Sequence, residues 1–235
     1  MPAIDIKKGA VVRLVQGRYA EKVYSRDPIK TAKHWVKQGA QFLHIVDLDA
    51  AINSRSDNFS LIKHIPRAVD IPVEIGGGIR TEKAISQLLD AGFSRVVLGT
   101  KAVEDKNFLK KARRKFEDRI IVSIDAREGK VMIKGWRAAH AGVSVVEFID
   151  SLKAMGFKEI IYTDTLKDGT LKGPNIKAIK SLLKSGLGII ASGGISSLED
   201  IRRLKALKKY GLTGVIVGKA LYEGKFTLPQ ALKLA

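Results

Sequence analysis

Short apolar runs alternate along the chain with longer segments in which apolar residues recur every three or four positions. The short runs are nearly continuous in Val, Ile and Leu, as expected of parallel strands that are buried on both faces. The longer segments place their apolar residues on one side, which predicts amphipathic helices. The chain therefore alternates predicted strands with predicted helices.

The first apolar run is followed by Lys-Lys-Gly and a second run, which predicts a strand that continues into a small hairpin. We expect strands at 3–6 (with the hairpin through 11–15), 42–46, 73–75, 95–98, 120–124, 159–162, 188–191 and 214–217. We expect helices from Pro28 to a stop at Gly39, at 59–65, after a Thr81 cap, and at 105–116, 143–155, 174–183, 197–207 and 228–234.

Eight strand-then-helix units in 235 residues predict an α/β protein with a closed (β/α)8 TIM barrel. An open doubly wound sheet is the competing architecture. The composition does not change at any point along the chain, so we expect one domain over 1–235, with half-barrels at about 1–117 and 118–235.

Glycine-rich turns in corresponding places support this internal duplication. The sequence IGGGIR at 75–80 has a counterpart in ASGGIS at 191–196, and pairing Gly77 with Gly194 gives a spacing of 117 residues (194 − 77). The same spacing pairs 46–47 with 163–164, while Asp5 and Asp125 lie 120 apart and Gly99 and Gly218 lie 119 apart. Four correspondences in the same order favour a closed, pseudo-twofold barrel over the open sheet.

Composition narrows the possible functions. The chain has no cysteine, which excludes disulfides, thiolate metal sites and cysteine nucleophiles. With 42 Lys and Arg against 24 Asp and Glu the net charge is +18, but the densest basic runs, 110–115 and 202–209, fall in predicted helices and are typical of solvated outer faces. Aromatic residues make up only 6%, which offers little surface for stacking bases. We expect no nucleic-acid partner.

The sequence also lacks targeting signals and metal-binding motifs. The sequence contains no apolar run of membrane-spanning length and no signal-peptide core, so we expect a cytoplasmic protein without a membrane partner. The four histidines lack metal-ligand spacing, which predicts no metal site.

The reactive face of a barrel lies at the carboxyl ends of its strands, where the glycine turns fall. Turns without side chains let backbone N–H groups approach a phosphate, and a helix follows each turn. A second loop accompanies each turn, Gly99–Thr100 in the first half and Gly218–Lys219 in the second. Any one of these glycines alone would indicate only a tight turn, but their duplication predicts two phosphate sites on opposite sides of the barrel mouth.

Carboxylates are the candidate catalytic groups. Asp5 and Asp125 end the first and fifth strands, which face each other in an eight-stranded barrel, and opposed carboxylates suit general acid and base catalysis. Asp168–Gly169 follows the sixth strand and is either an ordinary Asp-Gly turn or part of the site. Thr163 at the end of that strand bonds either a ligand or its own backbone, and Trp136 lies in a polar loop where an aromatic side chain indicates ligand contact.

The ordered set of motifs resembles the phosphoribosylformimino-aminoimidazole carboxamide ribotide isomerases, the sugar isomerase family of histidine biosynthesis. The motifs are PAIDIKKGAVVRLVQG, VYSRDP, HIVDLDAA, EIGGGIRT, VVLGTKAV, VSIDAREGKV, KGW, TDTLKDGTLKGPN and ASGGISS. The resemblance implies a barrel of two half-barrels and an Amadori rearrangement of an aminoaldose to an aminoketose on a substrate with two phosphates. It also implies that no cofactor is needed, because proton transfers suffice.

Carried over onto this sequence, the resemblance implies that Asp5 is the general base acting at sugar C2. Asp125 resembles the general acid that protonates the ring oxygen, with Asp168 as a rival candidate assisted by Thr163. The implied ligand contacts are Gly77, Gly78, Arg80, Gly99 and Thr100 at one phosphate, Gly193, Gly194, Gly218 and Lys219 at the other, and Arg13, Trp136 and Gly169 between them.

Two alternatives within the same fold stay open at this point. One is the related imidazole glycerol phosphate synthase cyclase, which typically has Cys and Lys around its first-strand Asp. The other is a bispecific isomerase that also acts on phosphoribosylanthranilate through Asp5. We expect a monomer with a bisphosphorylated small-molecule substrate.

Overall fold

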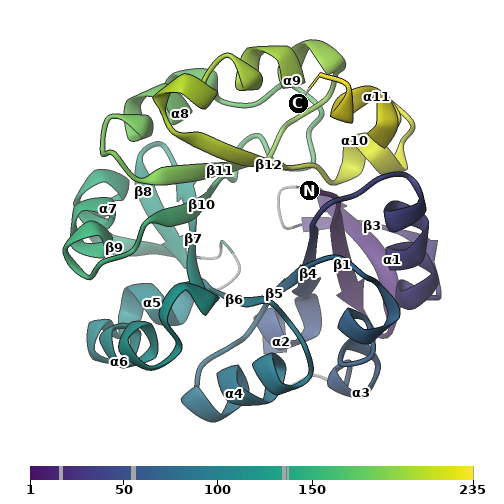
Figure 1. The fold of residues 1–235 in the computed structure, drawn as a ribbon. Coiled ribbons are helices and arrows are strands. Elements are labelled where there is room, and N and C mark those ends of the chain that lie inside the picture. Colours follow the sequence, from purple (N-terminus) through teal and green to yellow (C-terminus); the bar gives the residue numbers. More distant parts are fainter. Residues whose placement is uncertain (16–17, 54–56, 134–135, 137, 235) are drawn as a thin grey trace.

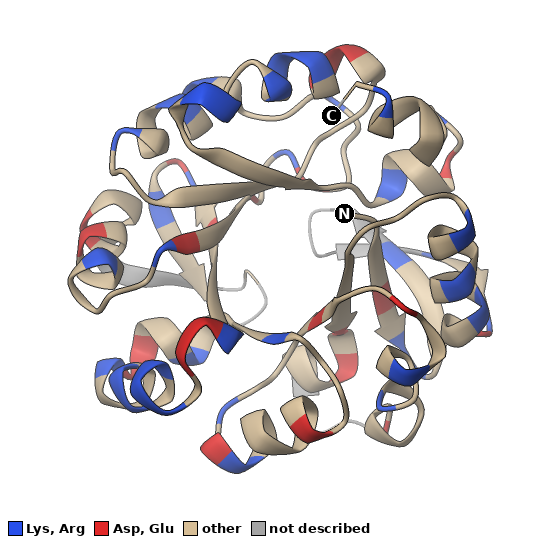
Figure 2. Ribbon diagram, in the orientation of Figure 1, with Lys and Arg blue, Asp and Glu red and all other residues tan. Residues whose placement is uncertain are grey.

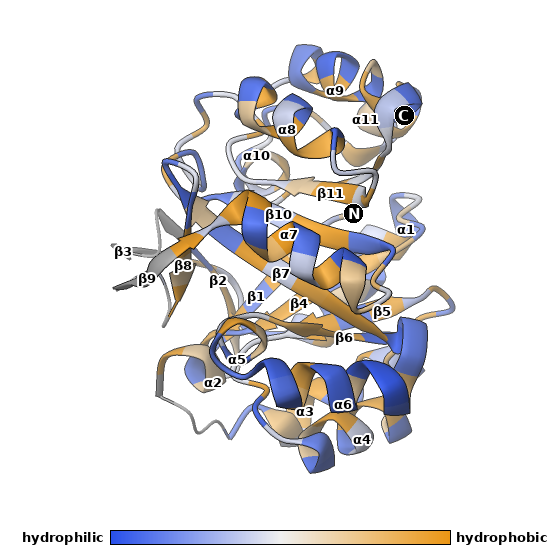
Figure 3. Ribbon diagram, turned by 90° about the vertical axis from the view of Figure 1, so that its left-hand side faces the viewer, coloured by the Kyte–Doolittle hydropathy of each residue, from blue (hydrophilic) through white to orange (hydrophobic). Residues whose placement is uncertain are grey.

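The computed structural model describes residues 1–235 except 16–17, 54–56, 134–135, 137 and 235 (Figure 1). Parts of two motifs, Gln16–Gly17 and Lys134–Gly135, therefore lie outside the described residues. Within the described chain, parallel strands form an inner ring and helices form an outer layer around it (Figure 1). Hydropathy colouring shows orange strands inside and blue outer helix faces (Figure 3).

Eight parallel strands make the ring, in the spatial order in which they occur in the sequence. They are β1 (Ala3–Lys7), β4 (Leu43–Asp47), β5 (Val73–Gly76), β6 (Arg95–Leu98), β7 (Ile120–Arg127), β10 (Glu159–Asp164), β11 (Gly188–Ser192) and β12 (Leu212–Ile216). The ring closes where Ala3 N donates to Val217 O at 3.0 Å and Val217 N donates to Met1 O at 2.9 Å. The predicted closed barrel is confirmed, and the open sheet is excluded.

The helices of the outer layer begin at the residues that the sequence marks as caps. Thr81 accepts from Ala84 N as the predicted cap, and the helix predicted to start at Pro28 is capped by Asp27, whose side chain accepts from Lys30 N. The helices are α1 (Pro28–Lys37), α2 (Leu48–Asn53), α3 (Phe59–Ile62), α4 (Glu82–Asp90), α5 (Thr100–Glu104), α6 (Lys106–Phe116), α7 (Val145–Ala154), α8 (Ile176–Leu183), α9 (Leu198–Lys205), α10 (Lys219–Tyr222) and α11 (Leu228–Leu232). Single 3-10 turns occur at Pro66–Ala68, Glu117–Arg119 and Lys208–Tyr210.

The short helices α2, α5 and α10 are absent from the sequence prediction. Four to six residues contain too few turns for a helical period to emerge from the apolar pattern. All three directly follow barrel strands, so they lie at the face where the site is expected. The basic runs 110–115 and 202–209, predicted for outer helices, lie in α6 and around α9. Figure 2 shows the Lys and Arg residues of these helices in blue.

Two antiparallel hairpins extend from the ring, one in each half. β2 (Ala10–Val15) and β3 (Arg18–Ser25) follow β1, and β8 (Lys130–Ile133) and β9 (Ala138–Ser144) follow β7. The first hairpin is larger than predicted and the second was missed, with 143–144 predicted as helix instead. Both turns pair a left-handed residue with Gly: Lys8–Gly9 (φ 49 and 73) and Glu128–Gly129 (φ 51 and 76).

Alternate residues of the strands stack in layers inside the ring. An apolar layer is formed by one residue from each of several strands: Ala3, Val97, Ile121, Ile161, Ile190 and Ile216, with Met1 packed against it. Arg95 and Glu159 lie two residues before Val97 of β6 and Ile161 of β10, toward the start of these strands. Gly99 and Thr163 lie two residues after the same pair, toward the opposite end. The apolar layer thus lies between Arg95 and Glu159 at one end of the barrel, its base, and the mouth at the other.

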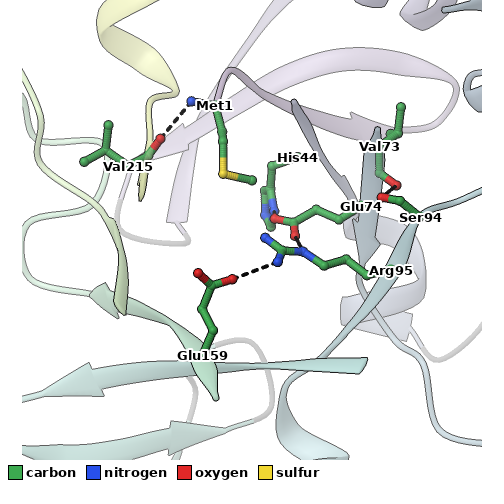
Figure 4. Close-up of polar contacts among 8 residues, drawn as sticks. All are labelled: Met1, His44, Val73, Glu74, Ser94, Arg95, Glu159 and Val215. Atoms are coloured by element: carbon green, nitrogen blue, oxygen red, sulfur yellow. Dashed lines mark hydrogen bonds and ion pairs between the residues drawn. The ribbon is translucent and has the colours of Figure 1, made fainter. Parts of the chain in front are cut away.

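The base is an ionic cluster that joins the two halves of the barrel (Figure 4). The fully buried Glu74 carboxylate accepts from His44 Nδ1 at 2.6 Å and from Arg95 Nε, and Arg95 Nη1 reaches Glu159 Oε2 at 2.8 Å. Burial by itself would raise the pKa of Glu74, but the hydrogen bonds and charges of His44 and Arg95 outweigh it and hold the pKa below its ordinary value. The cluster is therefore stable with Glu74 ionised.

Replacing Glu74 with Gln tests this cluster. We expect Glu74→Gln to lower the free energy of unfolding by about 3 kcal/mol, because removing one member of a buried ion pair leaves the others uncompensated. Since the pKa of Glu74 is lowered in the folded state, its contribution is present above pH of about 4.5 and is lost as the pH falls further. Denaturant unfolding at several pH values measures both effects.

The exposed pair Lys115–Glu82, with its atoms 3.1 Å apart, offers a matched control. Glu82→Gln should cost less than about 1 kcal/mol, because exposed ion pairs contribute little. An equally small loss for Glu74→Gln would contradict the stabilising role of the base cluster.

Candidate active site

A cavity of about 280 Å³ opens at the carboxyl ends of the barrel strands. Every predicted site residue lines it, including residues separated by more than two hundred positions in the sequence, from Asp5 to Lys219. The lining residues from that prediction are Asp5, Arg13, Gly77, Gly78, Arg80, Gly99, Thr100, Asp125, Trp136, Thr163, Asp168, Gly169, Gly193, Gly194, Gly218 and Lys219. The barrel thus brings the two halves of the predicted site together in one cavity.

The first glycine turn follows β5 and packs against the loop after β4. Gly77 and Gly78 have left-handed φ values of 106 and 64. A Cβ on Gly77 would lie 2.2 Å from Asp47 O, and a Cβ on Gly78 would lie 2.2 Å from Ala50 O. Only glycine is compatible with this approach, so the turn keeps its backbone bare toward the cavity.

The second turn, after β11, has the same conformation. Gly193 and Gly194 have φ values of 92 and 83, and a Cβ on Gly194 would lie 2.5 Å from Gly173 O. The φ values and close approaches pair Gly77 with Gly193 and Gly78 with Gly194, a spacing of 116 (193 − 77). The sequence pairing of Gly77 with Gly194 was therefore wrong by one residue.

Each turn is joined by a second loop of matching geometry. Gly99 has φ −105 and ψ −111, Gly218 has φ −105 and ψ −104, and these residues precede α5 and α10. Thr100 and Lys219 are the first residues of these two helices. The duplication predicted from sequence is thus present in the backbone, while the side chains differ between the halves.

Arg80 has a structural role in the first turn besides lining the cavity. Its Nη1 donates to Gly78 O at 2.9 Å and to Ala50 O at 3.3 Å, which ties the turn to α2. At the corresponding position Ser196 instead bonds Asp200 Oδ2 through its backbone N at 2.9 Å and its hydroxyl at 2.8 Å. The first turn therefore carries a guanidinium that the second lacks.

Asp5 forms an ion pair on one side of the cavity. Arg13 Nη1 lies 2.6 Å from Asp5 Oδ2, and Arg13 also donates to Ala3 O. The guanidinium lies 4.7 Å from the ring centroid of Tyr222, a cation–π distance. A Cβ on Gly218 would lie 3.1 Å from Arg13 Cζ, so the loop at Gly218 directly abuts this pair.

Asp125 occupies the other side and is held by Trp136. The indole Nε1 donates to Asp125 Oδ2 at 2.7 Å, and Trp136 adopts a left-handed φ of 68, which is uncommon for a bulky residue. Burial raises the pKa of Asp125, while hydrogen bonds from Trp136 and Thr163 act in the opposite direction. Thr163 is thus a hydrogen-bonding neighbour of Asp125.

Asp168 lies in the loop after β10, within electrostatic reach of both other carboxylates. Burial, followed by the negative charge of Asp5, raises the pKa of Asp168 to about 7, and Arg13 partly opposes this rise. A carboxyl group with this pKa holds its proton in much of the population at neutral pH. Of the two readings of Asp168, an ordinary Asp-Gly turn or a site residue, the raised pKa therefore favours a site residue.

A pair of Asp–Asn bonds, missed in the sequence, supports both loops. Asn58 Nδ2 donates to Asp47 Oδ1 at 2.9 Å, and Asn175 Nδ2 donates to Asp164 Oδ2 at 2.7 Å. The two aspartates and the two asparagines are each 117 positions apart. The sequence contained a signal for these bonds, because Asp47 and Asp164 already aligned at a spacing of 117. Extending that alignment would have paired Asn58 with Asn175.

Two further properties concern the described part of the chain alone. Its His, Asp and Glu residues form no group of three that is placed to hold a metal ion. Its helices include none that is both long and apolar enough to span a membrane.

Known proteins resemble this chain over its full length. The profile of one family, described as histidine biosynthesis protein, matches residues 1–227. A 1-(5-phosphoribosyl)-5-((5-phosphoribosylamino)methylideneamino)imidazole-4-carboxamide isomerase of Moorella thermoacetica is 47% identical, covering 100% of this chain and 97% of the relative. The proteins of the same name from Syntrophomonas wolfei and Alkaliphilus metalliredigens are 48% and 49% identical and cover 100% and 97% of this chain, and 97% and 95% of themselves.

The electrostatics of the site lead to a direct measurement on Asp168. We expect its carboxyl group to titrate near pH 7, and Asp5→Asn to lower that pKa because the replacement removes a neighbouring negative charge. Carboxyl ¹³C NMR against pH measures both values. The exposed Asp90→Asn serves as control and should leave the titration in place. A wild-type Asp168 that titrates near 4, the ordinary value, would contradict the burial described here.

Proposed function

Because the chain belongs to the histidine biosynthesis protein family, we propose that it catalyses the isomerisation for which its relatives are named. The substrate is a phosphorylated ribotide, 1-(5-phosphoribosyl)-5-((5-phosphoribosylamino)methylideneamino)imidazole-4-carboxamide, and the reaction converts its aminoaldose to an aminoketose. One observation supports the proposed site: the cavity that contains Asp5, Asp125 and Asp168 is also lined by two glycine turns of the same conformation.

The two turns suit the two phosphates of this substrate. Bare backbone at Gly77–Gly78 and at Gly193–Gly194 offers N–H groups to phosphate oxygens, and Gly99 and Gly218 add a second loop to each. A molecule with a phosphate at each end would span the mouth, so its reacting sugar would lie over the carboxylates. Since all these residues come from one chain, the arrangement supports a monomer as the catalytic unit.

The rearrangement requires an acid at the ring oxygen and a base at C2. The acid gives its proton to the furanose ring oxygen as the bond from C1 to that oxygen breaks and a C1–N iminium forms. The base then removes the C2 proton to give an enolamine. The enolamine becomes the aminoketose when C1 takes a proton back from the base and the C2 hydroxyl loses its proton to the carboxylate that the acid became, so that C2 becomes the carbonyl and both groups are regenerated. Electrons move only within the substrate, so the two carboxyl groups suffice.

We assign the base to Asp5 and the acid to Asp168. Asp5, ion-paired with Arg13 at 2.6 Å, is available as the proton acceptor. Asp168 has a pKa of about 7, which lets it hold and release a proton at neutral pH, as an efficient general acid requires. Asp125 is the rival acid, since its pKa is also raised, but both Trp136 and Thr163 bond its carboxylate.

Trp136 and Arg13 complete the proposed substrate contacts. The indole is fixed at one edge by Asp125, which leaves its ring to pack against the planar imidazole carboxamide. Arg13 shares its guanidinium between Asp5 and Tyr222 beside the second phosphate loop. Both side chains therefore stand between the two phosphate turns and the reacting sugar.

Steady-state kinetics with the bisphosphorylated aminoaldose test this function. We expect Asp5→Asn and Asp168→Asn each to lower kcat at least ~10²-fold, because each removes a proton-transfer group. The wild-type kcat/KM, which reports pKa values of the free enzyme, should decline as the pH rises through about 7, since Asp168 then loses the proton that it donates.

Asp70→Asn, an exposed replacement, is the control and should keep wild-type rates. Full turnover by both active-site variants would refute the assignment of base and acid. Absence of turnover by the wild-type protein would refute the proposed reaction.

A further inference from the structure

Lys219 begins α10 beside the second glycine turn, yet its side chain bonds a different loop. The ammonium Nζ donates to Gly169 O at 3.0 Å, in a partly buried contact. Gly169 directly follows Asp168, so one bond connects the start of α10 to the residue next to the proposed acid. Lys219 also lines the cavity, where a phosphate on this turn would lie.

The loop that carries Asp168 is anchored at both of its ends. At its start Asp164 accepts from Asn175 at 2.7 Å, and at its far end Gly173 N donates to Gly194 O at 2.9 Å. Near its centre Asp168 N donates to Asp164 O at 3.0 Å. The bond from Lys219 adds an anchor directly after Asp168, where the left-handed Gly169 (φ 68) turns the chain.

The described residues of the first half show no counterpart of this bond. Ala51 is 117 residues before Asp168 and therefore corresponds to it, and Thr100 corresponds to Lys219 at the spacing of the Gly99–Gly218 pair. The nearby Lys101 bonds Asp105 at 2.9 Å, within the junction of α5 and α6. A lysine thus reaches the loop in the half in which Asp168 lies.

We propose that Lys219 is a positioning residue that holds Asp168 in its buried place, and that phosphate at the second glycine turn strengthens this hold. An ammonium group has three donors, so Lys219 can bond a phosphate oxygen while it keeps the Gly169 carbonyl. Phosphate binding would then order the acid before the chemistry begins. The proposal rests on the proposed function for the identity of the acid.

The pH dependence distinguishes positioning from a simple charge effect. The groups that face Asp168 are Asp5 on β1, Arg13 on β2 and Asp125 on β7, with its own Gly169 backbone and Lys219 on α10. Loosening the loop would admit water and lower the pKa of Asp168, because burial is the largest cause of its rise. Removal of a nearby positive charge alone would raise that pKa.

Kinetics of three variants test the proposal. We expect Lys219→Met to lower kcat at least ~10-fold, since small misplacement of a catalytic group is costly, and to move the alkaline decline of kcat/KM to lower pH. Lys219→Arg, which keeps a charged donor, should restore most of kcat and the wild-type pH profile. Lys205→Met, the loss of an exposed lysine on the outer helix α9, should change kcat less than about 2-fold because Lys205 does not line the cavity.

An unchanged kcat with only a raised KM in Lys219→Met would overturn the proposal and leave Lys219 as a phosphate contact. A shift of the alkaline decline to higher pH would overturn it as well, since that direction indicates a charge effect.

Hydrogen exchange supplies a test that needs no turnover. Amides in 165–172 should exchange faster in Lys219→Met than in the wild-type protein, and inorganic phosphate should slow them in the wild type only. Equal exchange in the two proteins, with and without phosphate, would overturn the proposal even if the isomerase activity is found. Conversely, the expected exchange pattern without isomerase activity would retain the contact and refute only the proposed reaction.

Discussion

The hydrogen bonds that close the ring between β1 and β12 are the constraint on which the rest of the structure depends. Through Met1, Ala3 and Val217 the first strand pairs with the last, so no strand edge is left between them. Closure also brings all the strand ends to one mouth, where Asp5 from the start of the chain lies within a few ångströms of Arg13 and, through it, of Gly218. Without that closure the two halves would hold two separate loops and no shared cavity.

The two ends of the barrel interior differ in their chemistry. The charged base of Glu74, Arg95 and Glu159 links the halves below the apolar layer, and the cavity opens above it. An ion cluster at the base is costly to bury and is kept only by its mutual bonds. The mouth instead carries Asp168, whose pKa is raised by burial and by the negative charge of Asp5.

The two halves share a backbone and differ in side chains. Both have a left-handed glycine pair packed on an Asp–Asn-supported loop, and both open a short helix with a glycine of the same φ and ψ. At corresponding positions of the two halves, Ala51 in the first half matches Asp168 in the second, Arg80 matches Ser196, and Thr100 matches Lys219. Symmetry of the frame suits a substrate with a phosphate at each end, and asymmetry of the side chains suits a reaction that needs an acid on one side.

The sequence by itself determined the eight strands and the closed barrel, because these follow from local apolar patterns, caps and a repeated spacing. The residues that line the cavity were predicted partly from the repeated spacing and partly, as for Arg13 and Arg80, from the family resemblance. It did not determine α2, α5, α10 or the second hairpin, since segments this short are stabilised by packing on the ring and not by their own periodicity. The pairing of Gly77 with Gly193, which aligning 75–80 with 191–196 position by position also gives, is supported by φ values and close approaches. The raised pKa of Asp168 and the reach of Lys219 to Gly169 also required the tertiary structure, because burial and contacts between distant residues exist only once the ring has closed.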